Sequence, residues 1–138
     1  MDIVEKTFEA KVDNLHDVLG FLEEQLESHG ASMKVINLMS ISMEEMFANV
    51  CMYAYADSKT QGDCTIRIWF NDNDANVMII DNGMEFNPLA KEDPNIHLTA
   101  EERDVGGLGI YMVKEYMYEC TYERKDNQNI FVMRKAIK

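Results

Sequence analysis

An apolar run that ends on an aspartate is the first place in this sequence where chemistry could occur. Residues 77–80 are short, apolar and rich in types that favour a pleated strand, and Asp81, Asn82 and Gly83 follow them directly. Asp-Asn-Gly is typical of a hairpin turn. Here it leads into the long, mixed polar segment 84–105 instead of a second strand, and a loop of that length indicates a function. The sequence therefore predicts a strand that delivers the Asp81 carboxylate to a pocket.

The long loop ends in a glycine cluster that opens a helical pattern, formed by Gly106, Gly107, Leu108 and Gly109. Such a turn presents free backbone N–H groups and the positive end of a helix dipole, and both attract an anion. An aspartate that could bind an amine and a glycine turn that could hold phosphate thus flank one loop.

Segment 32–56 predicts a buried helix, because apolar residues surround most of its circumference. Ser42, Glu45, Asn49 and Tyr53 nevertheless recur at helical spacing along one narrow stripe. A carboxylate there needs a structural ion pair, a solvated edge or a functional ligand. Glu45 and Asn49, one turn apart, would direct two oxygen-bearing groups to one point. Such oxygen ligands suit Mg²⁺ that is held jointly with the phosphates of a nucleotide.

The composition is that of one globular domain, expected to span residues 1–138. Of the 138 residues, 46% are hydrophobic and 28% are charged, which is ordinary for a soluble domain with a real core. The net charge of −12 would repel a nucleic acid or an anionic membrane, so a basic protein surface is the better partner. Cys51, Cys64 and Cys120 show no metal or redox spacing and suit reduced thiols of a cytoplasmic protein. No leader pattern and no apolar run of about 18 residues is visible.

The elements that must position these residues follow from the periodicity of the apolar side chains. Helices are expected over 15–28, with Asn14 as the cap, over 32–56 and over 108–117. Strands are expected over 3–12, 65–70, 77–80, 120–124 and 130–134, the second and third forming a hairpin. The pattern predicts an α+β fold: a two-layer sandwich with a mixed, mostly antiparallel sheet and helices on one face.

Three segments, in this order, resemble the conserved boxes of the GHKL ATPase superfamily, and within it the anti-sigma factor serine/threonine kinase group. Residues 45–49 match the box in which Glu precedes Asn by four positions, 81–88 match Asp-x-Gly-x-x-Phe-Asx-Pro, and 106–110 match the second glycine box. Tyr53-Ala54-Tyr55 is similar to the usual His-Ala-Tyr, and Tyr122, Arg124, Asn129 and Lys135 resemble the tail pattern. Tyr53 in place of His and Tyr118 in place of an acidic residue depart from the group.

The resemblance implies roles for individual residues. Asp81 would accept a hydrogen bond from the adenine amine, Gly83 would let the chain pass beside the base, and Phe86 belongs to the same nucleotide-binding box. Asn49 would ligate Mg²⁺, and Glu45 would be the general base that deprotonates a substrate serine. Residues 84–105 would form a mobile nucleotide lid, and the phosphates would contact the backbone N–H groups of Gly106, Gly107, Leu108 and Gly109.

The resemblance also implies a function. It indicates a cytoplasmic, ATP- and Mg²⁺-dependent serine/threonine protein kinase that phosphorylates a small anti-sigma factor antagonist and binds a sigma factor, with a homodimer as the usual state of the group. Two alternatives stay open. One is a catalytically silent, nucleotide-gated protein-binding module, and the other is the ATP-binding domain of a histidine-kinase-like system, for which the sequence shows no phosphoacceptor helix.

Overall fold

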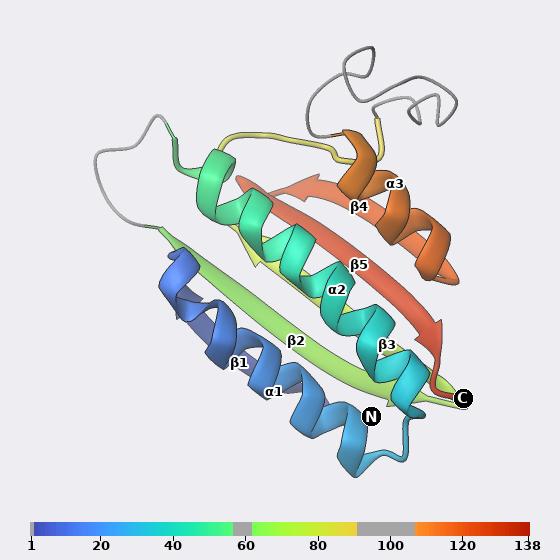
Figure 1. Cartoon of the computed structure of the whole chain (residues 1–138). Helices are drawn as coiled ribbons and strands as arrows, with labels where there is room; N and C mark the ends of the chain where they lie inside the picture. Colours follow the sequence, from blue (N-terminus) through green and yellow to red (C-terminus); the bar gives the residue numbers. More distant parts are fainter. Residues whose placement is uncertain (1, 57–61, 91–106) are drawn as a thin grey trace.

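The computed structural model describes residues 2–56, 62–90 and 107–138 as a sheet covered on one face by helices (Figure 1). In chain order the elements are β1 (Val4–Glu9), the 3₁₀ turn η1 (Val12–Asn14), α1 (Leu15–Ser28), α2 (Met33–Asn49), the π-helical turn η2 (Val50–Ala54), β2 (Asp63–Asn71), β3 (Asp74–Asp81), α3 (Gly107–Tyr116), β4 (Glu119–Lys125) and β5 (Gln128–Ala136). In Figure 1 the helices α1, α2 and α3 all lie on the same side of the sheet. The predicted α+β fold is confirmed.

The sheet has the strand order β1-β2-β3-β5-β4, and every strand pairing in the described part is antiparallel. The predicted hairpin is confirmed as β2 and β3, with Ile66 opposite Ile79. The register between β3 and β5 places Asn129 directly opposite Asp81. Two polar residues, far apart in the sequence, therefore meet at one end of the central strands.

The core lies between the sheet and the helical layer. Residues at helical spacing bury one face of each long helix: Val18, Leu22 and Leu26 on α1, and Met39, Met43 and Phe47 on α2. The sheet contributes alternate residues of its central strands, among them Ile66, Ile68, Val77 and Met133. Each large apolar side chain buried in this way stabilises the fold by roughly 1.5–3 kcal/mol. This core holds α2 over the central strands and so fixes the position of Glu45 and Asn49 relative to Asp81.

Three local features differ from the sequence prediction. The first strand ends at Glu9, and the Asn14 side chain does not cap α1 but donates to the Glu9 carbonyl at 2.9 Å. A side-chain cap forms instead at the start of α2, where Ser32 Oγ accepts from the Val35 N–H at 3.2 Å. The predicted helix 32–56 continues past α2 only as the wider π-helical turn η2, a form often found at functional sites. None of the described helices is long and apolar enough to cross a membrane.

Candidate functional site

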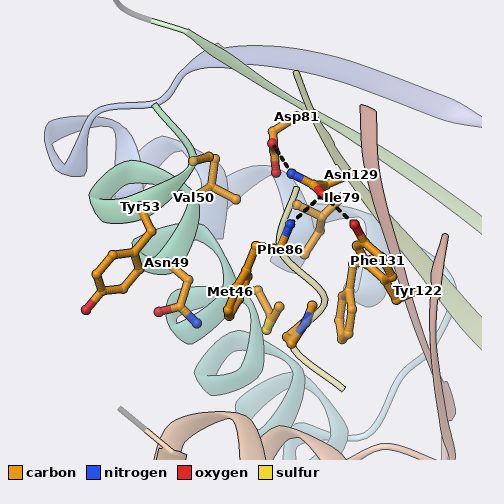
Figure 2. Close-up of a pocket in the computed structure, with 12 residues that line it drawn as sticks. Met46, Asn49, Val50, Tyr53, Ile79, Asp81, Phe86, Tyr122, Asn129 and Phe131 are labelled. Carbon is orange, nitrogen blue, oxygen red and sulfur yellow. Dashed lines mark hydrogen bonds between the residues drawn. The ribbon is translucent and has the colours of Figure 1, made fainter. Parts of the chain in front are cut away.

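A small hollow opens between the end of α2 and the central strands (Figure 2). It is lined by side chains from α2, η2, β3, β4, β5 and the segment after β3: Met46, Asn49, Val50, Tyr53, Ala54, Ile79, Asp81, Phe86, Pro88, Tyr122, Asn129 and Phe131. Its volume of about 40 Å³ has room for only a few water molecules. In the view of Figure 2, Phe86 lies between Asn49 on α2 and Phe131 on β5. Phe86 is 45% exposed, so it borders both the hollow and the solvent.

Asp81 and Asn129 form the polar end of this hollow. Both are buried, at 7% and 6% exposure. The Asn129 side-chain amide donates to Asp81 Oδ1 at 2.8 Å, and the Gly83 N–H donates to the same oxygen at 2.9 Å. Both bonds fall on Oδ1, so neither uses Oδ2. A buried carboxylate held by two donors is fixed in orientation and can present its second oxygen to a ligand.

Asn129 also holds the chain that follows Asp81. Its Nδ2 donates to the Met84 carbonyl at 2.7 Å, and its Oδ1 accepts from the Phe86 N–H at 3.1 Å and from the Tyr122 hydroxyl at 2.6 Å. Arg124 Nη1 donates to the Gly83 carbonyl at 2.9 Å. The first residues of the predicted lid are therefore tied to the β4–β5 hairpin.

Two further contacts fix the turn after β3 against η2. The Met84 N–H donates to the Ala54 carbonyl at 2.8 Å, and the Asn82 N–H donates to the Tyr55 hydroxyl at 2.9 Å. A Cβ at Gly83 would lie 2.1 Å from the Ala54 oxygen, so only glycine fits there. Burial raises the pKa of the Tyr55 phenol above its usual value. The hydrogen bond from the Asn82 N–H lowers this pKa, and the nearby charge of Asp81 raises it.

Glu45 and Asn49 lie together on α2, as their spacing predicts. Asn49 Nδ2 donates to Glu45 Oε1 at 3.4 Å, and both side chains are half-buried. The Glu45 carboxylate also lies against Gly109 of α3, since a Cβ there would be 2.2 Å from its Oε1. Ser42, from the same predicted stripe, is instead fully buried and donates to the Leu38 carbonyl at 2.9 Å. The structure thus brings Glu45 and Asn49 together and separates Ser42 from them.

The predicted phosphate-binding turn is described only in part. Gly106 and residues 91–105 of the predicted lid lie outside the described residues, whereas Gly107, Leu108 and Gly109 are the first three residues of α3. The N–H groups of a first helical turn have no partner inside the helix, and the helix dipole adds positive charge to them. This end of α3 therefore suits an anion. The same end of the helix contacts the Glu45 carboxylate through Gly109.

Metal and thiol chemistry is limited in the described part of the chain. Across residues 2–56, 62–90 and 107–138 there is no group of three His, Cys, Asp or Glu side chains that could hold a metal ion. The cysteines there are free, and burial raises the pKa of Cys51 and of Cys120 to about 11 and that of Cys64 still further. These thiols are therefore poor nucleophiles at neutral pH.

Sequence reasoning assigned no contact to several residues that hold this site. Asn129, Tyr122 and Arg124 resembled a family tail, but the sequence did not show that they bind Asp81 and the turn after it. The signal that could have found Asn129 is a polar residue at the start of an apolar strand, where an unpaired amide would be costly if it were buried. Tyr55 gave no such signal, because tyrosine suits a helix end or a core edge equally well.

Comparison with known proteins assigns the chain to a family. The sequence profile of the histidine kinase-like ATPase domain matches residues 8–135. The chain belongs to the histidine kinase-like ATPase family. No curated protein matches it in sequence.

Two solved structures share its fold. One is the crystal structure of the RsbU and RsbW domains of Rv1364c from Mycobacterium tuberculosis, with a TM-score of 0.69 and 15% identity over 99% of this chain and 33% of that chain. The other is the histidine kinase domain of the blue-light activated histidine kinase EL346 from Erythrobacter litoralis, with a TM-score of 0.56 and 14% identity over 89% of this chain and 61% of that chain. The chain therefore spans about a third of the first protein and about three fifths of the second. At these identities the likeness concerns the fold.

Proposed function

We propose that this chain is an ATP-dependent serine/threonine protein kinase of the anti-sigma factor type. It would transfer phosphate from ATP to a serine of a small anti-sigma factor antagonist in the cytoplasm, bind a sigma factor and act as a homodimer. The observation that carries the proposal is the contact between Glu45 and Asn49, which joins a carboxylate to the hollow that contains Asp81. The three family boxes and the structural likeness to a protein with an RsbW domain support the choice within the family.

The residues around the hollow suit an adenine nucleotide. Asp81 would accept the exocyclic amine of adenine on Oδ2, because Asn129 and Gly83 already occupy Oδ1. Phe86 would move from its position in the hollow and pack against the base. The phosphates would bind the N-terminal amides of α3, with Gly106 extending that turn.

The side chains present also fit Mg²⁺ as an ion shared with the nucleotide. Asn49 offers one carbonyl oxygen, and the described residues contain no cluster of carboxylates that could hold the ion alone. A site with one or two protein oxygens is typical of Mg²⁺ that completes its shell with phosphates and water. When bound, the ion would neutralise phosphate charge.

Glu45 would act as the general base. Its carboxylate would accept the proton of the serine hydroxyl while that oxygen bonds to the γ-phosphorus and the bond from phosphorus to the leaving ADP oxygen breaks. Asn49 Nδ2 holds Glu45 Oε1 at 3.4 Å, and contact with Gly109 fixes the carboxylate from the α3 side. The base is therefore positioned before substrate binds.

The test is to separate nucleotide binding from phosphate transfer. The full chain is incubated with radiolabelled ATP and a small protein of the anti-sigma factor antagonist class, and ATP affinity is measured by calorimetry. Glu45→Gln should leave affinity nearly unchanged and lower transfer by roughly 10²–10⁴, while Asn49→Ala should weaken both. Glu24→Gln, an exposed carboxylate on α1, is the control and should change neither. Transfer at the wild-type rate by Glu45→Gln would refute the assignment of the base.

The runner-up is a nucleotide-gated binding module that transfers nothing. It is favoured by the exposed aromatic rings beside the hollow, since Tyr53 is 49% and Phe86 is 45% exposed and both could contact a partner. Under this alternative the wild-type chain binds ATP and the antagonist but leaves the antagonist unlabelled. If Glu45 only stabilises the fold, Glu45→Gln should instead lower the melting temperature.

A further inference from the structure

The α2 helix presents different side chains to two separate hollows. Asn49 lines the hollow with Asp81, whereas Ile41, Glu44, Glu45 and Ala48 line a groove between α2 and α3. Residues three or four positions apart share one face of a helix, so these four form a continuous stripe. The proposed base thus lies in the groove, and its hydrogen-bond partner lies in the nucleotide hollow. The two hollows meet at the contact between Glu45 and Asn49.

The α3 helix supplies the other wall of this groove through Gly109, Met112, Val113 and Tyr116, which also recur at helical spacing. Val113 is 2% exposed and belongs to the floor, while Ile41 across the groove is 45% exposed. Gly109 has no Cβ, and the Glu45 carboxylate occupies the space that a Cβ would fill. The groove is therefore largely apolar and carries the side chains of Glu44 and Glu45 on its α2 wall.

We propose that this α2–α3 groove docks the hydroxyl-bearing segment of the acceptor protein, so that its serine reaches Glu45 from a side separate from the nucleotide. This proposal rests on the kinase function proposed above. The acceptor segment would place an apolar side chain between Ile41 and Met112, and a basic residue beside the exposed carboxylate of Glu44. The adenine and the acceptor segment would then occupy different hollows, and the phosphates would meet the acceptor hydroxyl where Glu45 contacts Gly109.

Size and charge favour a peptide segment over other occupants. The groove holds about 230 Å³, less than the roughly 300–1,000 Å³ of a typical small-molecule site, and so fits one or two side chains. Glu44 and Glu45 line it and no lining residue is basic, so it attracts a positively charged segment.

The test compares steady-state kinetics of groove variants with matched controls, using the full chain and the same antagonist-class protein as acceptor. Glu44→Lys and Ile41→Ser should each raise KM for the antagonist by about tenfold and leave KM for ATP unchanged. Glu24→Lys makes the same charge change on an exposed position of α1, and Val12→Ser removes an apolar side chain that is 59% exposed in η1. Both controls should stay within about twofold of the wild type.

The outcomes separate the two proposals. An active wild-type chain whose groove variants keep the wild-type KM for the antagonist would overturn the docking site and leave the kinase function standing. An equal rise of KM for ATP and for the antagonist would also overturn it, because the groove would then not be separate from the nucleotide site. A wild-type chain that binds ATP and transfers nothing would remove the kinase function, and the docking of an acceptor serine with it.

Discussion

Replacing Gly109 by alanine should disable the proposed base without unfolding the protein. An alanine Cβ would lie 2.2 Å from both Cδ and Oε1 of Glu45 and 2.6 Å from Oε2. The carboxylate must move by about 1 Å before these contacts reach the 3.4 Å of ordinary van der Waals packing. The side chain of Glu45 is flexible, so we expect it to rotate while the backbone of α3 stays in place.

The expected magnitudes follow from that displacement. A misplacement of about 1 Å in a catalytic group can lower the rate about 10²-fold, equivalent to about 2.7 kcal/mol of transition-state stabilisation. Stability should stay within about 1 kcal/mol of the wild type, because alanine favours a helix over glycine by about that amount and offsets the strain. ATP affinity should change little, since the backbone N–H of residue 109 remains. The rate of phosphate transfer should thus fall while stability and ATP affinity stay close to those of the wild type.

The assay measures single-turnover transfer, ATP affinity and melting temperature for Gly109→Ala. Gly20→Ala is the matched control, because Gly20 is also helical and a Cβ there would meet nothing within 4 Å. Glu45→Asp draws the carboxylate back by about 1.5 Å, so in the Gly109→Ala background it should recover part of the lost rate. Wild-type transfer by Gly109→Ala, at an unchanged melting temperature, would refute the reasoning.

Three further predictions concern Gly83, Asn129 and two of the cysteines. Gly83→Ala should lower the free energy of unfolding by about 1–3 kcal/mol, because its Cβ would meet the Ala54 carbonyl at 2.1 Å; urea denaturation measures this. Asn129→Ala should lower the free energy of unfolding by about 1–3 kcal/mol and weaken ATP binding, because Asp81 loses its side-chain hydrogen-bond donor. An unchanged ATP affinity in calorimetry would contradict this. With pKa values of about 11, Cys51 and Cys120 should be alkylated at pH 8 roughly 10²-fold more slowly than in the unfolded chain. In the folded chain their alkylation rate should rise about tenfold for each pH unit as the thiolate forms, and mass spectrometry follows both rates.

Much of the fold could be predicted because its signals are local. Helical spacing in α1 and α2 and alternation in β2 follow from which side chains must leave water, and that pattern is written in neighbouring residues. The spacing of Glu45 and Asn49 likewise determines that they share a helix face. Asp81 at the end of β3 follows from the strand that precedes it. These features need no knowledge of where distant segments lie.

The tertiary structure decided what distant segments do to one another. Asn129 is far from Asp81 in the sequence, and only the register between β3 and β5 makes them neighbours. The predicted polar stripe of α2 divides, because α3 packs against Glu45 through Gly109 while the sheet side faces Asn49. Periodicity gives the angle of a residue on its own helix, but the packing partner at that angle depends on the whole chain. The sequence alone thus determined which side chains this protein can use, and packing between remote segments decided which of them share a site.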